Sequence, residues 1–208
     1  MKKITKYIPT IILTLLCSCS DYLDIVPDNV TTLDIVFNNR NTAERYLANC
    51  YHFVPDHGSV KRIPGMGAGH ECWFYTTNDS HFDNEVSFYI ARGLQNIDAP
   101  YANYWDGEGG SNLPMFRAIR ECNIFLDYVR DQHKVNDLTD SERKRWIAEV
   151  NVLKAYYHFF LFEHYGPIPI VDKALPVSTD PEGVKVTRMP VDQIVDYMVK
   201  LIDDSYKD

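Results

Sequence analysis

The chain has 208 residues, of which 45% are hydrophobic and 13% aromatic, enough for one globular domain with a sizeable core. Its formal net charge is -8 at pH 7. A surface of that sign repels nucleic acid and anionic headgroups, which argues against both as partners.

The N-terminus has the pattern of an export signal. Three lysines fall within the first six residues, and the apolar run 8–16 is shorter than a membrane-spanning helix but as long as a signal-peptide core. Residues 16–19, Leu-Cys-Ser-Cys, resemble a bacterial lipobox, in which the cysteine after the cleavage site is acylated. We therefore predict a lipoprotein signal peptide over 1–18 and a lipid anchor at Cys19, with ordinary secretion as the alternative. Residues 19–40 then form a tether.

Three further cysteines, Cys50, Cys72 and Cys122, show no Cys-x-x-Cys spacing. An odd number in an exported chain leaves at least one thiol unpaired. We predict that all three are buried as small apolar side chains, and a single disulfide among them stays open.

Apolar residues at helical spacing predict four helices, of which the first two lie in the N-terminal two thirds of the chain. The first begins at Asn41, where Glu44 fits a capping box, and ends before Pro55. The second covers about 113–132. Its expected buried face comprises Met115, Ile119, Cys122, Leu126 and Val129.

The third and fourth helices follow. The third runs from Thr139, where Glu142 completes another capping box, to His164, just before a Gly-Pro stop. Its expected buried face comprises Trp146, Val150, Leu153, Tyr157, Phe160 and Leu161. The fourth begins at Pro190 and carries an apolar stripe nearly to the last residue. Such a stripe needs another helix to cover it, so we expect this chain to be the front part of something longer.

The segments between the helices are long. Residues 58–112 are rich in Gly, Asn, Asp and aromatic residues, and only 84–94 has a helical pattern. Residues 167–188 form an extended connector that contains proline. Because no clear strand alternation is present, the predicted fold class is all-α, a tetratricopeptide-like helical stack with long irregular loops that is incomplete at its C-terminus. Long loops in a compact domain are usually functional.

No catalytic, metal or cofactor motif is complete. His158 and His164 are six residues apart and so lie on different helix faces, and no His-Glu-x-x-His occurs. The glycine-rich residues 65–69 fit neither a dinucleotide-binding nor a Walker loop, and a flexible loop is expected there. Carboxylate pairs such as Asp79 with Asp83 leave a glycoside hydrolase open as an alternative, since that reaction uses two acids across the sugar.

Aromatic rings next to amide and carboxylate groups are the best ligand candidates in the loops, because a sugar ring stacks on an aromatic face while its hydroxyls form hydrogen bonds. The candidate glycan-binding residues are Trp73, Tyr75, Asn78, Asp79, Tyr101 and Trp105. The alternative is that these rings hold the loop against the helices, and for Trp105 this is at least as good an explanation.

Several stretches match one known pattern. Residues 19–24, CSDYLD, precede Pro27, and further on Trp105 is followed by a Phe-x-x-Ile-x-x-x-Asn arrangement that begins at Phe116. Residues 149–171 contain EVNVLKAYYHF and then YGPIP. Together these stretches resemble the N-terminal part of SusD/RagB-family lipoproteins of the Bacteroidetes, with Phe116 in place of the usual Tyr.

This resemblance implies a role and a domain organisation. It implies a cell-surface, outer-membrane lipoprotein that binds glycans or other nutrients and delivers them to a TonB-dependent transporter of the SusC type, without being an enzyme. A secreted or anchored glycoside hydrolase stays the alternative. Residues 41–208 would form the N-terminal helical domain of the family, whose members are more than twice as long. No ligand-binding residue is carried over, since the family's ligand residues lie on variable loops.

Overall fold

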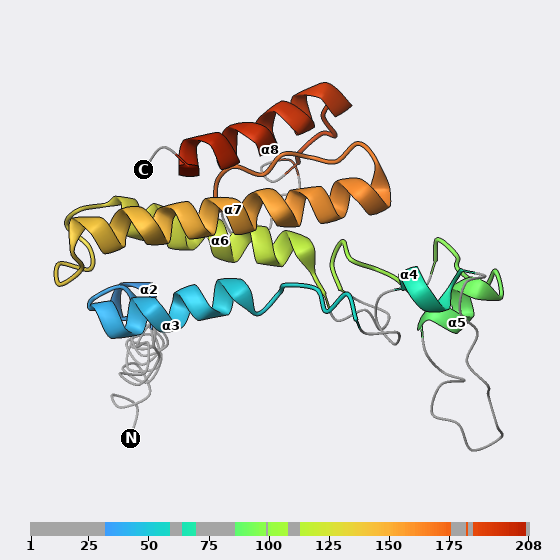
Figure 1. The fold of residues 1–208 in the computed structure, drawn as a ribbon, viewed down its shortest axis with the longest axis horizontal. Helices are drawn as coiled ribbons and strands as arrows, with labels where there is room; N and C mark the ends of the chain where they lie inside the picture. Colours follow the sequence, from blue (N-terminus) through green and yellow to red (C-terminus); the bar gives the residue numbers. More distant parts are fainter. Residues whose placement is uncertain are drawn as a thin grey trace, which may run out of the picture. The chain divides into compact units, whose positions relative to one another are not determined.

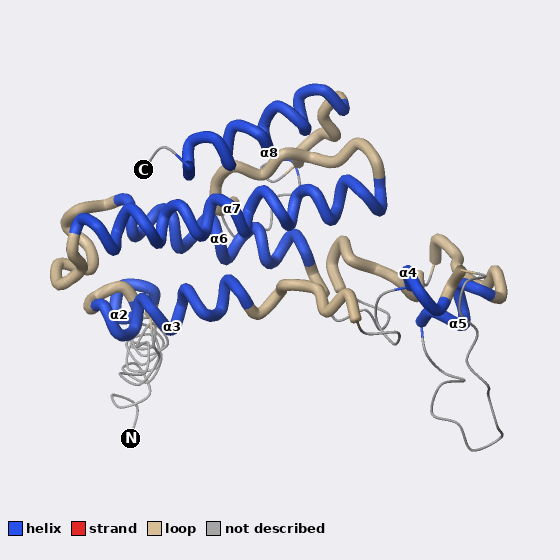
Figure 2. The backbone as a smooth tube through the Cα atoms, in the orientation of Figure 1, coloured by secondary structure: helices blue, strands red, loops and turns tan. Residues whose placement is uncertain are grey.

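The computed structural model describes residues 32–58, 64–69, 86–98, 100–107, 113–175, 182 and 185–206. The chain divides into two units, 1–35 and 36–208. Of the first unit only residues 32–35, where a short helix begins, are described. Throughout the described residues the secondary structure is helical and no strand is present, as the tube in Figure 2 shows, so the predicted all-α class is confirmed.

Among the described residues, the second unit contains four long helices and two short ones, and a further short helix begins in the first unit. In chain order the helices are α2 (Leu33–Val36), α3 (Arg40–Tyr51), α4 (Pro64–Gly67), α5 (Val86–Ala91), α6 (Met115–Arg130), α7 (Asp140–Tyr165) and α8 (Val191–Tyr206). α7 packs against α3, α6 and α8, and α3 also packs against α6. Successive long helices run in opposite directions (Figure 1), the arrangement expected of a helical stack.

Local signals explain most of the helix ends. Thr139 and Glu142 form the predicted capping box at the start of α7, and Gly166 with φ 68° ends the helix. α3 begins one residue before the predicted Asn41, and its N-cap lies two residues before the predicted one. Asn39, rather than Asn41, caps this helix, since its side chain accepts a hydrogen bond from the Thr42 N–H at 3.1 Å.

Three short helices differ from the sequence-based expectations. α5 ends at Ala91 rather than at the predicted residue 94, because Gly93 with φ 72° turns the chain after it. α4 occupies the start of the segment predicted as a flexible glycine loop, and α2 falls within the predicted tether.

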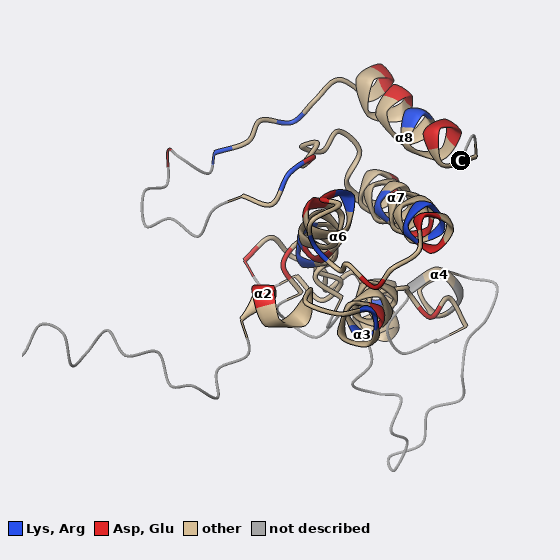
Figure 3. Cartoon of the chain, turned by 90° about the vertical axis from the view of Figure 1, so that its left-hand side faces the viewer, with Lys and Arg blue, Asp and Glu red and all other residues tan. Residues whose placement is uncertain are grey.

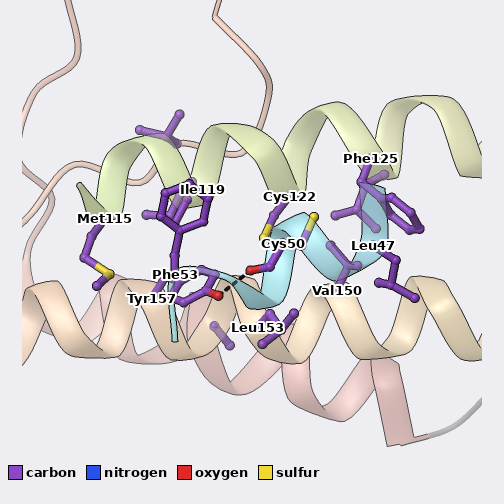
Figure 4. Packing of buried hydrophobic residues seen from close by; sticks show 14 of the residues in the cluster. Leu47, Cys50, Phe53, Met115, Ile119, Cys122, Phe125, Val150, Leu153 and Tyr157 are labelled. Carbon is purple, nitrogen blue, oxygen red and sulfur yellow. Dashed lines mark hydrogen bonds between the residues drawn. The ribbon is translucent and has the colours of Figure 1, made fainter. Parts of the chain in front are cut away.

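The core lies where α3, α6 and α7 meet (Figure 4), and both predicted buried faces are buried. Cys50 and Cys122 face each other inside it and are free thiols, as expected of small buried side chains. Tyr157 Oη donates to the Cys50 carbonyl at 2.5 Å, which satisfies both polar groups within this apolar interface. Cys72 lies outside the described residues.

The apolar stripe of α8 is only partly covered among the described residues. Ile194 and Met198 are buried against α7, whereas Val195, Val199 and Ile202 remain 39%, 50% and 49% exposed. The α8 stripe therefore keeps an exposed apolar part among the described residues.

Candidate functional site

The segment 100–107 is fixed between the ends of two long helices. The Tyr104 N–H donates to Tyr165 Oη of α7 at 2.8 Å, and the Met115 N–H of α6 donates to the Tyr104 carbonyl at 2.9 Å. Burial raises the pKa of Tyr165, so its hydroxyl stays protonated and donates to the Ala102 carbonyl at 3.3 Å. These bonds hold the backbone just before Trp105 in place.

A glycine completes this turn toward α6. Gly107 has φ +85°, a conformation that side chains with a Cβ rarely adopt. A Cβ at this position would also lie 2.8 Å from Cδ of Pro114, the residue just before α6. Glycine is therefore required for the close approach of the Trp105 segment to the start of α6.

Trp105 is half-buried and contacts three side chains. Its ring lies edge-on to Phe116 at 4.6 Å and to Tyr165 at 5.5 Å, measured between centroids. The guanidinium carbon of Arg188 lies 5.2 Å from the ring centroid, a cation–π contact. Trp105 therefore packs against α6 and α7, as the alternative to a ligand-binding role predicted. Its ring also lines a neighbouring cavity.

That cavity, which we call the Trp105 pocket, has a volume of about 410 Å³. This volume lies within the range of ~300–1,000 Å³ that is usual for small-molecule sites. Its lining residues come from the segment before α6, from α6 itself and from the connector between α7 and α8. They are Trp105, Phe116, Arg120, Pro169, Val171, Lys173, Leu175, Lys185 and Val186.

The connector directs alternate side chains into the pocket. Val171, Lys173 and Leu175 line it, whereas Asp172 between them bonds to Lys154 of α7 at 2.8 Å. This alternation is the period of two that extended backbone imposes. Arg120 reaches from α6 to donate a hydrogen bond to the Leu175 carbonyl, which ties the connector to the helix.

Two of the predicted ligand residues are described, and the structure does not bring them into one site. Trp105 lines the pocket, whereas Tyr101 is not among its lining residues and stacks on Tyr89 at 4.3 Å with an interplanar angle of 15°. Trp73, Tyr75, Asn78 and Asp79 lie outside the described residues, as does the predicted anchor Cys19.

The cationic residues of the pocket were not among the ligand residues predicted from the sequence. Arg120 is not part of the buried face predicted for its helix, and residues 167–188 were predicted only to be an extended connector. Its three basic residues are balanced by three acidic ones, so no charge run marks it. Only the path of the folded connector, with Lys173 and Lys185 on the pocket side, brings these charges together.

The described part of the chain contains no cluster of three or more His, Cys, Asp or Glu side chains that would form a metal site. Asp106, which follows Trp105, accepts a hydrogen bond from the Asn103 amide at 2.5 Å. Within the same residues, no helix combines the length and the apolar character needed to cross a bilayer.

A family model described as SusD-like, starch-binding and associating with the outer membrane matches residues 21–207. The chain belongs to this family. The resemblance seen in the sequence motifs is therefore confirmed. No curated protein sequence matches the chain.

Solved structures of SusD-like proteins share its fold. A laminarin-binding SusD-like protein matches with a TM-score of 0.59 at 16% identity, over 81% of this chain. A SusD-like protein from Bacteroides fragilis matches with a TM-score of 0.60 at 15% identity, over 86% of this chain. The chain spans about a third of the length of these proteins, 34% and 31% respectively.

Proposed function

We propose that this chain acts as a cell-surface lipoprotein, anchored in the outer membrane through Cys19, that binds glycans and delivers them to a TonB-dependent transporter of the SusC type. The family match over residues 21–207 is the observation that carries the proposal. The laminarin-binding description of one structural relative supports a saccharide as the ligand class.

The chemistry of the Trp105 pocket suits a saccharide. A half-buried indole offers a flat apolar surface to the C–H face of a sugar ring, and Phe116 supports it from the side. Arg120 and Lys173 supply N–H donors for hydroxyl oxygens at the same pocket. An apolar wall with a few convergent polar groups is typical of a small-ligand site.

Binding without turnover fits this pocket better than hydrolysis. A glycoside hydrolase needs two carboxyl groups placed on either side of the scissile bond. Among the described residues that line the Trp105 pocket, none carries a carboxylate. We therefore assign no catalytic residue and propose a binding protein rather than an enzyme.

Titration of the purified protein with maltohexaose and with laminarihexaose, followed by calorimetry, tests the proposal. We expect saturable binding to at least one saccharide, with the sugar recovered intact by chromatography after prolonged incubation. Trp105→Ala should weaken that binding ~10-fold or more, as truncation of an aromatic anchor commonly does.

Tyr206→Ala is the matched control, since Tyr206 is an aromatic residue that is 92% exposed and lies outside the Trp105 pocket. This variant should bind as the unmodified protein does. Circular dichroism of both variants checks that the helices remain folded. Shortened oligosaccharides after incubation would instead support the hydrolase, and equal binding by both variants would remove Trp105 from the site.

A further inference from the structure

Four cationic side chains converge on the Trp105 pocket, although the whole chain is acidic. Arg120, Lys173 and Lys185 line the pocket, and the Arg188 guanidinium lies over the Trp105 ring. The chain as a whole carries a net charge of -8. Figure 3 shows both basic and acidic positions along the connector between α7 and α8. The residues of the connector that line the pocket include Lys173 and Lys185 but no acid. A local reversal of charge at a pocket indicates the sign of its ligand.

The two arginines are held by backbone oxygens rather than by carboxylates. Arg188 donates to the Pro167 carbonyl at 2.9 Å, and Arg120 donates to the Leu175 carbonyl. Each of these bonds uses one of the five N–H donors of a guanidinium and leaves its positive charge without neutralisation by that partner. The bonds therefore orient the two guanidinium groups and preserve their capacity to bind an anion.

The lysines are also suited to a ligand. Lys173 extends from the connector on the pocket side, beside Val171 and Leu175. Lys185 pairs with Glu182 at 3.3 Å, but both side chains are largely exposed, at 68% and 77%. An exposed pair of this kind contributes little free energy, so Lys185 can exchange Glu182 for an anionic group of a ligand at small cost.

We propose that the Trp105 pocket is selective for saccharides that carry an anionic substituent, a carboxylate or a sulfate. The sugar ring stacks on Trp105 while the anionic group bonds to Arg120, whose planar fork matches a carboxylate or sulfate, with Lys173 and Lys185 around it. This inference rests on the proposed glycan-binding function and narrows its ligand class from neutral starch-like glycans to acidic ones.

Matched ligands test the charge requirement directly. The purified protein is titrated with tetragalacturonic acid, with its fully methyl-esterified form, with a sulfated glucan tetramer and with maltotetraose. We expect the acid to bind at least ~10-fold more tightly than its ester, corresponding to ~1.4 kcal/mol. Its affinity should fall as sodium chloride is raised from low to physiological concentration, because the contacts are between charges. The sulfated tetramer shows whether sulfate can replace carboxylate.

Substitutions test which side chains bind the anionic group of the ligand. Arg120→Gln and Lys173→Gln should each remove most of the preference for the acid over the ester, measured as the ratio of the two affinities in the same variant. Arg117→Gln is the matched control, because Arg117 lies on the same helix, is 69% exposed and is not a lining residue. It should keep the preference. Lys173→Gln is the variant expected to fold normally even if Arg120→Gln does not, because the Lys173 side chain is exposed.

The titrations distinguish failure of the acidic-saccharide inference from failure of the glycan-binding function. Equal affinity for the acid and the ester, or a preference that survives Arg120→Gln and Lys173→Gln in folded protein, overturns the acidic-saccharide inference. Tight binding of maltotetraose with dependence on Trp105 also overturns it, yet leaves the glycan-binding function standing. Binding of none of the four saccharides overturns both.

Discussion

His158 is a fully buried histidine on α7 in contact with a small polar network. Its Nδ1 donates to the Lys154 carbonyl at 2.7 Å, and its Nε2 has no hydrogen-bond partner among the described residues. The ring lies edge-on to Tyr197 of α8 at 5.2 Å. The pKa of His158 is lowered from 6.5 to about 4, mainly because burial disfavours the charged ring. The Lys154 charge also lowers it, whereas the hydrogen bond to the Lys154 carbonyl and the Asp172 charge raise it.

The same network contains an ion pair whose partners differ in environment. Lys154 is buried and its pKa is lowered by desolvation, even though it bonds to Asp172 at 2.8 Å. The Asp172 side chain is 64% exposed, and hydrogen bonds from Lys154 and Tyr197 outweigh its burial and lower its pKa. The pair therefore favours the charged carboxylate more than it favours the charged amine.

The buried histidine predicts a pH dependence of folding. Because the folded state holds His158 neutral down to about pH 4 while the unfolded state protonates near pH 6.5, the free energy of unfolding falls as pH decreases through this window. The loss over the window is roughly 3 kcal/mol. His158→Phe cannot take up the proton, so urea denaturation at pH 7 and pH 4.5 should show a much smaller difference for this variant.

His133→Gln is the control for that measurement, because His133 is exposed in the turn between α6 and α7. It should keep the full pH dependence of the unmodified protein. A His158→Phe variant that loses as much stability as the unmodified protein between the two pH values would contradict the assignment to His158.

At the scale of the elements, Arg143 joins the end of α6 to the start of α7. Its side chain is buried in the first turn of α7, and its guanidinium donates to four backbone carbonyls. These are Val129 at 2.5 Å, Asp131 at 3.3 Å, Lys134 at 3.1 Å and Val135 at 3.0 Å. The arginine thereby satisfies carbonyls at the C-terminal end of α6 and fixes the turn after it.

Removing this group should destabilise the whole helical stack. We expect Arg143→Ala to lower the free energy of unfolding by about 3 kcal/mol, because four carbonyls lose the hydrogen bonds that they accept from a charged donor. Arg145→Ala is the matched control two residues away. Arg145 is 62% exposed and pairs with Glu149 at 3.5 Å, so its loss should change stability by less than ~0.5 kcal/mol. Similar denaturation midpoints for the two variants would contradict this.

The element scale also shows which features can be predicted from sequence. The capping box of α7 and the buried faces of α6 and α7 depend on residues within a turn or two of each other, and they were predicted. The cap of α3 was not, because Asn39 and Asn41 are equally suitable residue types. A distant residue completes this terminus, since the Arg40 N–H donates to Asp137 at 2.7 Å across 97 positions. No local pattern contains that contact.

In the candidate site, too, some residues could be predicted from local sequence and others depend on tertiary contacts. Trp105 could be predicted from residue type and from its polar loop, since aromatic rings there suit both packing and sugar binding. The cations around it could not, because Arg120 lies on a helix while Lys173 and Lys185 come from a connector with balanced charge. The hydrogen bond from Arg120 to the Leu175 carbonyl, a tertiary contact, ties the connector to α6.

At the scale of the whole molecule, charge and anchoring are linked. Removal of the proposed signal peptide, residues 1–18, would take away three lysines and no acid, so the net charge would change from -8 to -11. A surface this acidic is repelled by anionic headgroups. In the proposed lipoprotein, covalent lipid would therefore supply the attachment to the membrane, and more than one acyl chain is needed for stable anchoring.

The proposed anchor at Cys19 is tested by two single substitutions in the lipobox. Cys19→Ser removes the acylation site, so the protein should move from the membrane fraction to the soluble fraction of cells separated by ultracentrifugation. Cys17→Ser is the matched control, because Cys17 lies before the proposed cleavage site and is lost with the signal peptide. That variant should stay in the membrane fraction, and mass spectrometry of its N-terminal peptide should show acylated Cys19. Membrane retention of Cys19→Ser through a high-salt wash would refute the anchor, since neither lipid nor charge could then account for it.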